Sequence, residues 1–375
     1  MKFEVLSSDL MSHLNAVSRV LVGKNAMPIL DNFLFVIKED KLTITASDGD
    51  TTMITSVPVT NVESSGAFVV PAKTLIEPLK EMPQQQLTIE VDNGNYEVIV
   101  SYVNGKYNFI GGNAAEYPVL KELEPDRKVF EINPQALLNG IQSTIFATAD
   151  DELRPVMNGI YFDIKPDSVI FVASDSKKLV RLINSATAPG FEANFILPKK
   201  PATLLKNIIT KDQLLCTVSF DSKSARFQLS DYELSCRLIE GRYPRYEVVI
   251  PKNNTNRLTI DRQSFLSSLR RIAVFSNSAT NQVKFELSPV NLTMSAQDVD
   301  YSTAGTETIQ CSYDGNPMSI GFRASFLIEI LNTITSQDVE MLLSDGARAG
   351  LVTPVQNNEG EELLMLIMPM MLSDF

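Results

Sequence analysis

The sequence predicts an α+β fold built from three tandem repeats, and three sets of similar segments carry this prediction. The first set opens each third of the chain with a short strand and a helix-like segment, beginning at Phe3, Phe130 and Leu258. The second set is a helix-like segment that follows an apolar strand, anchored at Pro71, Pro198 and Arg323. The third set is an alternating hairpin that ends in an acidic turn, marked by Asp48, Asp175 and Asp298. Because corresponding members lie 123 to 128 residues apart and recur in the same order, the repeating unit is a whole domain.

The length of the chain agrees with three such domains. A chain of 375 residues exceeds the size at which a single core stops growing, which is roughly 250 to 300 residues. Segments rich in Pro, Asp and Asn, at 122–127 and 251–256, are typical of linkers. We therefore expect domains at residues 1–125, 126–251 and 252–375.

Each repeat is expected to contain a strand, a helix, an alternating hairpin, a further strand, a second helix and a closing pair of strands. Capping residues mark the start of the first helix, at Ser8 or Asp9, at Asn133 with Pro134, and at Asp261. The helices carry single apolar stripes, formed by Leu10, Leu14, Val17 and Leu21, by Leu75, Leu79 and Met82, and by Phe265, Leu269 and Ile272. Two amphipathic helices per repeat should therefore lie on one side of a sheet.

The chain is acidic, with 33 Lys+Arg against 45 Asp+Glu and a formal net charge of -12. Taken alone, this balance argues against a nucleic-acid partner. Much of the basic charge, however, is expected on the outer faces of the helices, at Lys73, Lys80, Lys199, Lys200, Lys206, Arg262, Arg270 and Arg271. Net charge averages over faces with different tasks, so a nucleic-acid partner stays open.

The residues that the chain lacks exclude several classes of enzyme. His13 is the only histidine, and we expect it on the surface of a helix, which excludes catalytic triads and HExxH zinc sites. No glycine-rich loop precedes a helix in the manner of a phosphate cradle. The acidic turns at Asp48 and Asp175 could hold a divalent cation, but Asp is also common in turns because it bonds its own backbone. We expect no cofactor and no metal.

The location of the protein is predicted by two further absences. The chain has no run of about 18 apolar residues and no secretory signal, so we expect a cytoplasmic protein. The three cysteines, Cys216, Cys236 and Cys311, are few and far apart, and we interpret them as small buried residues rather than as a disulfide framework.

Methionines crowd the C-terminus, where Met365, Met368, Met370 and Met371 surround Pro369. One interpretation is a buried edge strand that closes the third sheet. The other is a binding surface, because the unbranched side chain of methionine repacks around different apolar partners.

Four segments, taken with the repeats, carry a resemblance to a known family. They are MKFEVLSSDL at the N-terminus, LVGKNAMPIL from Leu21, EGRYPRYEVVIPK from Glu240, and the terminal IMPMML. Over its whole length the chain closely resembles the bacterial DNA sliding clamps, which are the beta subunits of DNA polymerase III. The resemblance implies sheets on the outside, two helices of each domain on the inside, and a head-to-tail homodimeric ring.

The resemblance also implies a function without catalysis. A ring of this family encircles double-stranded DNA without sequence specificity and tethers the replicative DNA polymerase, which makes synthesis processive. Further implied partners are the clamp loader and other polymerases and repair proteins that carry clamp-binding motifs such as QLxLF. A closed ring is retained by connectivity, so weak and exchangeable phosphate contacts suffice.

The family's partner-peptide pocket lies between the second and third domains. The positions that match it are Arg154, Met157, Ser174, Lys177, Lys178, Leu179, Pro244, Val248, Val249, Ser276, Arg323, Phe326, Ala347, Ile367, Met368, Pro369, Met370, Met371 and Leu372. The resemblance implies that Leu179, Pro244, Val249 and Met368 form an apolar socket. For each of these residues, core packing is the alternative.

The resemblance likewise implies a DNA-facing set and a joint between the two copies. The DNA-facing residues are Lys24, Lys73, Lys80, Lys199, Lys200, Lys206 and Arg270. The joint should pair the first domain of one copy with the third domain of the other by strand addition and an apolar patch, at Tyr107, Phe109, Val274 and Phe275.

Some positions depart from the family pattern, and two other functions remain as alternatives. Ser176 and two lysines follow Asp175 where a glycine is frequent, and Met371 replaces a residue that is often basic. The first alternative is an adaptor that binds proteins through the same methionine-rich groove without closing into a ring. The second is a metal-dependent hydrolase that uses Asp48 and Asp175.

Overall fold

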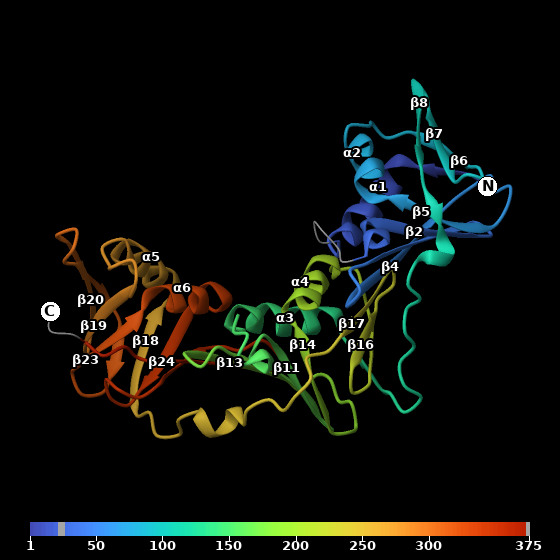
Figure 1. The fold of residues 1–375 in the computed structure, drawn as a ribbon. Helices are drawn as coiled ribbons and strands as arrows, with labels where there is room; N and C mark the ends of the chain where they lie inside the picture. Colours follow the sequence, from blue (N-terminus) through green and yellow to red (C-terminus); the bar gives the residue numbers. More distant parts are fainter. Residues whose placement is uncertain (22–26, 373–375) are drawn as a thin grey trace. The chain divides into compact units, whose positions relative to one another are not determined.

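The computed structural model describes residues 1–21 and 27–372, which form two compact units. Unit 1 comprises Met1–Gln135 with Lys200–Leu238, and unit 2 comprises Ala136–Lys199 with the residues from Ile239 onward. The segment expected to be the middle domain is therefore divided between the two units. Figure 1 identifies the elements of each.

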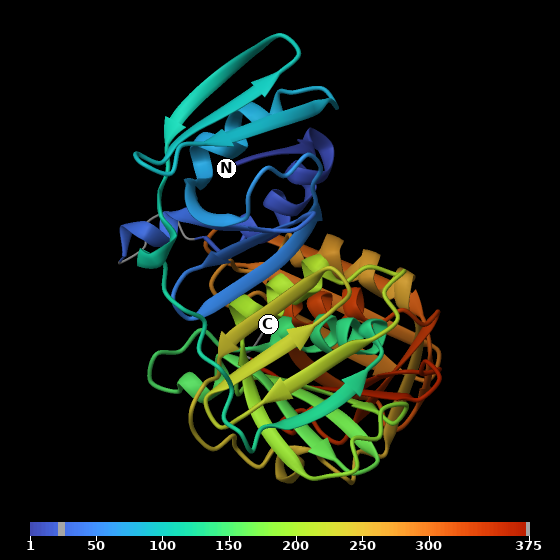
Figure 2. The same ribbon diagram turned by 90° about the vertical axis from the view of Figure 1, so that its right-hand side faces the viewer.

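Unit 1 contains two antiparallel sheets. The smaller has the strand order β1 (Lys2–Leu6), β6 (Gln86–Val91), β7 (Glu97–Tyr102) and β8 (Gly105–Ile110). The larger has the order β10 (Lys128–Ile132), β15 (Cys216–Phe220), β16 (Ser224–Gln228), β17 (Tyr232–Arg237), β4 (Thr51–Pro58), β3 (Lys41–Ser47), β2 (Asn32–Lys38), β5 (Gly66–Pro71) and β9 (Gly112–Asn113). The hairpin of β7 and β8, cyan in Figure 2, ends the smaller sheet, and β8 is its outer strand.

Unit 2 has the same plan of one large and one small antiparallel sheet. The larger runs β14 (Ala193–Pro198), β11 (Gly159–Lys165), β12 (Ser168–Ser174), β13 (Lys178–Asn184), β26 (Glu361–Ile367), β25 (Gly350–Pro354), β24 (Asp338–Leu343), β18 (Asn256–Asp261) and β22 (Ser312–Asp314). The smaller runs β21 (Thr303–Gln310), β20 (Asn291–Asp298), β19 (Gln282–Ser288) and β23 (Met318–Arg323). Its outer strands are β21 and β23.

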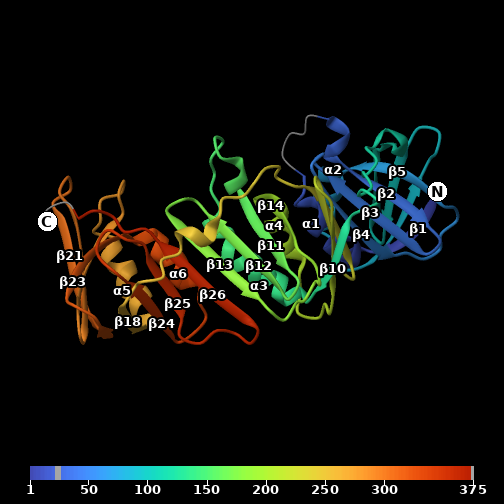
Figure 3. The same ribbon diagram turned by 90° about the horizontal axis from the view of Figure 1, so that it is seen from below.

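The large sheets continue across the expected domain boundaries. In unit 1, β17 of the second repeat pairs with β4 of the first, and Leu234 lies opposite Met53. In unit 2, β26 of the third repeat pairs with β13 of the second, as the neighbouring ribbons in Figure 3 show, and Met365 lies opposite Val180. Ladder hydrogen bonds at these positions join successive repeats into single sheets.

The six helices of the described residues are amphipathic, as predicted. They are α1 (Ser7–Ser18), α2 (Ala72–Lys80), α3 (Pro134–Thr144), α4 (Lys199–Ile208), α5 (Arg262–Ala273) and α6 (Ala324–Thr333). In unit 1, α1 packs against α2 and against β3 and β4, and in unit 2, α5 packs against α6 and against β20 and β21. The helices of each of these pairs lie side by side in Figure 1.

The buried faces of the helices follow the predicted stripes, but two stripe residues lie beyond the helix ends. Leu10, Leu14 and Val17 are buried on α1, and Phe265, Leu269 and Ile272 are buried on α5. Leu21 and Met82 follow the ends of α1 and α2 and are only partly buried. The close packing of α3 on β12 requires a glycine, because a Cβ at Gly140 would lie 2.6 Å from the ring of Phe171.

Two of the three predicted helix starts are confirmed. Asp261 caps α5 by accepting a hydrogen bond from the Ser264 amide at 2.7 Å, and Asn133 accepts one from the Gln135 amide at 2.8 Å. The prediction for Ser8 or Asp9 is wrong, since α1 begins at Ser7 without a side-chain cap and Ser8 instead donates to Asp9. The Ser7 hydroxyl donates to the Pro83 carbonyl and accepts from the Gln85 amide. These two bonds fix this end of the helix.

Each repeat has more strands than predicted. The expected hairpin is a three-stranded meander, because β4, β13 and β21 follow it, and the expected closing pair is a trio, such as β6, β7 and β8. The added strand in the first repeat is Thr51–Pro58, whose partly exposed face carries Thr and Ser. Five short 3-10 helices complete the described structure: η1 (Pro28–Asp31), η2 (Ala114–Glu116), η3 (Ile145–Ala147), η4 (Pro155–Met157) and η5 (Tyr246–Val249).

Candidate partner groove, basic helices and open sheet edges

The residues expected to bind a partner peptide all belong to unit 2. Most come from five segments: the start of η4, the turn between β12 and β13, the linker 241–250, the start of α6, and the tail 367–372 that ends β26. Ser276 and Ala347 belong to other segments, the first after α5 and the second before β25. Ser276 is buried and bonds the Ala273 carbonyl, whereas Ala347 is exposed in a turn.

Backbone hydrogen bonds bring the tail and the β12–β13 turn together. The Met368 amide donates to the Lys177 carbonyl at 2.9 Å, and Ile367 lies opposite Lys178 in the β13–β26 ladder. The turn is shaped by Asp175, whose Oδ1 accepts from the amides of Lys177 and Lys178 at 2.8 Å each. The positions of Ser174, Lys177 and Met368 are thus fixed by the main chain.

Lys178 is a buried cation with three neighbours. Its side chain is 6% exposed, and its Nζ lies 2.9 Å from Asp175 Oδ2 and 3.3 Å from Glu329 Oε2. The same Nζ lies 4.0 Å from the ring centroid of Phe326, which also has the Arg323 guanidinium 5.2 Å away. Lys178 therefore links the turn to α6 and holds the Phe326 ring at the groove.

The tail beyond β26 lies along the open edge of the small sheet. The Met370 amide donates to the Gly321 carbonyl on β23 at 2.8 Å, and Gln282 Nε2 donates to the Met371 carbonyl at 2.9 Å. A Cβ at Gly321 would lie 2.8 Å from the Met370 carbonyl oxygen, so the tail needs a glycine there. Gly321 and Gln282 were not identified from the sequence, because nothing in their neighbourhood signals a contact with residues so distant in the chain.

Exposure divides the expected apolar socket into a floor and a rim. Leu179 is 3% exposed and belongs to a buried cluster with Tyr243 and Leu366, so it is part of the core below the groove. Pro244 is exposed, and so are Val249 at 55% and Met368 at 43%. Val248 and Met371 are also exposed. Met157 is buried, as Leu179 is.

Two tyrosines anchor the linker that presents Pro244, Val248 and Val249. The Tyr243 ring stacks on Tyr161, with centroids 4.6 Å apart. The Tyr246 hydroxyl donates to the buried Asp163 carboxylate at 2.8 Å, and burial raises the pKa of Tyr246. The linker is therefore attached to the large sheet immediately around its three exposed apolar side chains.

Arg154 is exposed and is oriented by two partners. Its Nε donates to Asp151 Oδ2 at 2.8 Å, and its Nη1 donates to Ser176 Oγ at 2.5 Å. The hydrogen bond from Arg154 lowers the pKa of Asp151. The neighbouring Leu153 is 91% exposed and was not identified from the sequence, where a single leucine in a loop gives no signal.

The basic residues expected to face DNA lie on three helices. Lys73 and Lys80 belong to α2, Lys199, Lys200 and Lys206 to α4, and Arg270 to α5, while Lys24 lies outside the described residues. Lys73, Lys80, Lys206 and Arg270 are exposed. Lys199 is paired with Asp150 at 2.9 Å. Lys200 binds the Asp48 carboxylate and donates to the Val20 carbonyl at 2.6 Å, so its ammonium group is held within unit 1.

The residues expected at the joint lie at the outer strands of the two small sheets. Tyr107 and Phe109 are on β8, with ring centroids 6.3 Å apart, and burial raises the pKa of Tyr107 to about 12. Val274 and Phe275 follow α5 and are 79% and 37% exposed. The Phe275 ring covers Gly305 of β21, where a Cβ would lie 2.6 Å from it. Each small sheet thus has an open edge with apolar side chains beside it.

The three acidic turns hold their own backbone. Oδ1 of Asp48 accepts from Asp50 and Thr51 amides, and Oδ1 of Asp298 accepts from Asp300 at 3.0 Å, in the manner described for Asp175. Within residues 1–21 and 27–372, no three His, Cys, Asp or Glu side chains are placed to share a metal ion. The turns therefore have a structural role that accounts for their acidic residue.

The histidine and the cysteines have structural environments. His13 is half-buried rather than on the surface as predicted, because its Nδ1 lies 2.6 Å from the Thr55 hydroxyl and its ring lies beside Tyr232. Burial lowers the pKa of His13, against the raising effect of Asp231 and Asp9. Cys216 and Cys236 are buried, which raises the pKa of each thiol to about 12, and Cys311 is partly buried.

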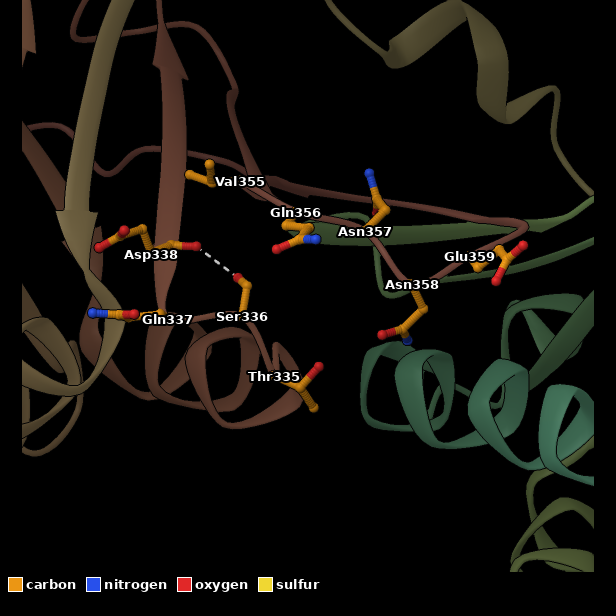
Figure 4. A pocket seen from close by; sticks show the side chains of 9 residues that line it. All are labelled: Thr335, Ser336, Gln337, Asp338, Val355, Gln356, Asn357, Asn358 and Glu359. Carbon is orange, nitrogen blue, oxygen red and sulfur yellow. Dashed lines mark hydrogen bonds between the residues drawn. The ribbon is translucent and has the colours of Figure 1, made fainter.

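A polar hollow of about 480 Å³ lies elsewhere in unit 2. Figure 4 shows its two facing segments, Thr335–Asp338 before β24 and Val355–Glu359 between β25 and β26. Ser336 Oγ donates to the Asp338 carbonyl at 2.6 Å, Asn357 Oδ1 accepts from the Leu363 amide, and Asn358 Nδ2 donates to Glu361, the last two partners being residues of β26. Their polar groups are thus engaged in shaping the loops.

Comparison with known proteins gives matches along nearly the whole chain. Models of the N-terminal, central and C-terminal domains of the DNA polymerase III beta subunit match residues 1–121, 131–245 and 247–371. The beta sliding clamp of Synechococcus elongatus is 28% identical over 383 residues, which cover 99% of this chain and all of the relative. That of Vibrio cholerae is 24% identical over 373 residues, with 99% and 100% covered.

Solved structures show the same fold. The sliding clamp of Pseudomonas aeruginosa superimposes with a TM-score of 0.94 at 24% identity, covering 99% of this chain and 100% of that one. The sliding clamp of Bacillus subtilis gives a TM-score of 0.93 at 23% identity, with both chains fully covered.

Proposed function

The chain belongs to the family of bacterial DNA sliding clamps, the beta subunits of DNA polymerase III, and we propose that two copies close head to tail into a ring around duplex DNA. Members of this family are non-catalytic processivity factors. The chain is therefore a replication protein rather than an enzyme. We further propose that the ring is cytoplasmic, that it has no sequence specificity, and that residues 1–125, 126–251 and 252–375 are its three domains per copy. No helix in the described part of the chain is long and apolar enough to cross a membrane.

The single observation that carries the ring is the pair of open edges near opposite ends of the repeat series. The edge strand β8 closes the first repeat and the edge strand β21 belongs to the third. An open strand with apolar side chains is a site for strand addition, and a head-to-tail contact of two copies satisfies both edges of each. Tyr107 and Phe109 would meet Val274 and Phe275 at each of the two joints.

Basic side chains on the helices support the proposal that the ring encloses DNA. Lys73, Lys206 and Arg270 are exposed on α2, α4 and α5. Exposed cations exchange readily between phosphates, so they hold DNA without fixing the position of the ring along it. Lys199 and Lys200 already have carboxylate partners and would contribute less to this contact.

The groove in unit 2 supports binding of partner proteins through a short peptide. Val248, Val249 and Met368 are exposed, Leu179 and Met157 are buried, and Arg154 donates to Ser176 of the turn that the Met368 amide contacts. This combination suits the apolar end of a QLxLF-like motif, with polar contacts at the rim. We propose that the replicative DNA polymerase, the clamp loader, and other polymerases and repair proteins with such motifs bind here in turn.

Loading the ring onto DNA tests the proposal. The purified protein, loaded on nicked circular DNA, should stay bound through gel filtration and should be lost when the DNA is cut once, because only connectivity retains it. Equal retention on circular and linear DNA would contradict encirclement. A predominantly monomeric protein at micromolar concentration, measured by sedimentation, would contradict the stable ring and would favour an adaptor.

Gly321→Ala should weaken peptide binding by roughly tenfold without affecting the dimer. The new Cβ would displace the Met370 carbonyl, which is 2.8 Å away, and with it the tail that carries Met368. Fluorescence anisotropy with a labelled QLxLF-like peptide measures the affinity. Gln282→Ala, which removes only the hydrogen bond to Met371, should show a smaller loss. Unchanged affinity in both variants would mean that the tail position does not matter for the groove.

A further inference from the structure

Ser176 has a backbone conformation that serine rarely adopts. It lies in the turn between β12 and β13, and its φ is 75°. A residue with a Cβ is strained in this left-handed region, whereas glycine is not. Strained residues cluster at binding sites, where interactions of the side chain offset the cost. The interactions of the Ser176 hydroxyl therefore bear on what this turn does.

The hydroxyl of Ser176 joins the turn to the loop before β11. Its Oγ accepts a hydrogen bond from Arg154 Nη1 at 2.5 Å and donates to Met157 Sδ at 3.8 Å. Arg154 is exposed, and Met157 is buried. The hydroxyl thus uses its acceptor and its donor on two residues assigned to the partner groove. A glycine at this position could bind neither of them.

Asp151 binds the same guanidinium through two other nitrogens. Both Nε and Nη2 of Arg154 lie 2.8 Å from Asp151 Oδ2, while Asp151 Oδ1 accepts from the Leu153 amide at 2.9 Å. A guanidinium has five N–H donors. Asp151 and Ser176 engage three of them among the described residues, which leaves one hydrogen on each of Nη1 and Nη2 for a ligand.

The charge of Arg154 is compensated before any ligand binds. Asp151 is ionised at neutral pH and supplies the countercharge at hydrogen-bond distance. An uncharged carbonyl oxygen can accept from the two remaining donors without electrostatic cost. A carboxylate would gain less than it gains from an unpaired arginine, because Asp151 would repel it.

Both partners of Arg154 are themselves held in place. The Asp151 amide donates to Asn158 Oδ1 at 2.9 Å, and Asn158 Nδ2 donates to the Asp151 carbonyl at 3.1 Å. The Ser176 amide donates to Ser174 Oγ at 3.1 Å. Because two anchored groups fix the guanidinium, a ligand that binds it pays little for ordering the Arg154 side chain.

We infer that Asp151 and Ser176 are positioning residues that hold Arg154 as a charge-compensated donor, so that the groove prefers peptides presenting an uncharged carbonyl to Arg154 over peptides presenting a carboxylate. The inference rests on the proposed partner groove and adds a chemical preference to it. Lys177 is an exposed cation of the same turn. Its attraction for a carboxylate is present with or without Asp151, so a comparison of variants isolates the effect of Asp151.

Pairs of labelled peptides test this preference. In each pair the two QLxLF peptides carry Asn or Asp at one position, which is the variable position, the position before the Gln or the position after the Phe. The native protein should bind the Asn peptide at least as tightly as the Asp peptide. Asp151→Asn leaves Arg154 as an unpaired cation, so at the position that faces Arg154 the affinity ratio should shift toward Asp by about fivefold. Fluorescence anisotropy at low ionic strength measures the ratio, since salt screens exposed charges.

Glu77→Gln is the matched control for the change in charge. Glu77 is exposed on α2 in unit 1 and pairs with Lys80 at 3.0 Å, with the same three-residue spacing as Asp151 and Arg154. The substitution changes the net charge of the protein as Asp151→Asn does. A general effect of net charge on the peptides would therefore appear in both variants, whereas we expect the ratio to change only in Asp151→Asn.

Ser176→Ala and Ser176→Gly separate the hydroxyl from the backbone conformation. Both variants lose the hydrogen bond to Arg154, so each should bind the preferred peptide about threefold more weakly. Only glycine relieves the strain at a φ of 75°, so the thermal midpoint should be higher for Ser176→Gly than for Ser176→Ala. If the affinity follows the thermal midpoint rather than the presence of the hydroxyl, Ser176 is not a positioning residue for Arg154.

The outcomes distinguish this inference from the groove itself. A shift of the ratio toward Asp in Asp151→Asn, absent from Glu77→Gln, supports the inference. A ratio that Asp151→Asn leaves unchanged at every position, or a native protein that binds the Asp peptide more tightly at the position that responds, would overturn the inference and leave the groove standing. A native protein that binds none of the peptides would contradict the proposed groove and this inference with it.

Discussion

A chain that ends at Ile367 should lose binding of a QLxLF-like peptide by at least about a hundredfold while remaining a dimer. Ile367 is the last residue of β26 and is fully buried, so the truncation preserves the β13–β26 ladder. It removes Met368 and the tail along β23. Losing one exposed apolar anchor costs about 1.5 to 3 kcal/mol, and the loss of Met370 and Met371 adds to it.

The measurement is peptide anisotropy, with sedimentation as the control for the dimer. A second chain that ends at Leu372 retains every tail residue in the groove and should bind the peptide with near-normal affinity. Peptide binding that survives truncation at Ile367 would show that the groove assignment is wrong. A truncated chain that is monomeric would place the joint at the tail, contrary to its assignment to β8 and β21.

Val274→Asp should convert the dimer to a monomer at micromolar concentration and abolish retention on nicked circular DNA. Val274 is 79% exposed in one copy, so the substitution costs little in folding. In the joint the new carboxylate would be buried without a countercharge, which costs several kcal/mol. Both joints of the ring carry the substitution, so its cost to the free energy of dimer dissociation is doubled.

Val290→Asp is the matched control for this substitution. Val290 is 64% exposed and belongs to the same repeat, but it lies in the turn between β19 and β20 rather than beside the end of α5. Sedimentation and retention should be unchanged in this variant. If the Val274→Asp protein stays dimeric, with the same thermal midpoint as the native chain, the apolar patch is not part of the joint.

The repeats and the helix faces could be predicted because they follow from periodic spacing. The stripes on α1 and α5 were predicted because apolar residues recur where a helix must bury them. The third meander strand was missed in each repeat, since strands such as Thr51–Pro58 are rich in Thr and Ser, and the acidic turn before each strand was interpreted as the end of the hairpin. The start of α1 was missed because the helix has no side-chain cap, and the Ser7 amide donates instead to the Gln85 carbonyl of a segment distant in sequence.

The residues of the candidate site were named from the resemblance and stay a prediction, and their contacts could not be predicted. The position of the groove came from the resemblance, whereas its support by Gly321, Gln282 and the Tyr246–Asp163 hydrogen bond depends on chain segments far apart in sequence. The neighbours of the basic residues could not be predicted either. Lys199 and Lys200 belong to a basic helix, yet each is bound to a carboxylate that the sequence does not place beside it.

The continuity of the large sheets across repeats has a consequence for the kinetics of opening. The strand pairs β17–β4 and β26–β13 are tethered by the chain, so a pair that separates is held at a high effective concentration and re-forms at once. A strand pair between two copies, as in the proposed ring, would have no tether and would bear the full entropy of association. Similar strand pairs can therefore stay closed within one copy and open reversibly between two copies. The covalent connection of the strands decides which of the two occurs.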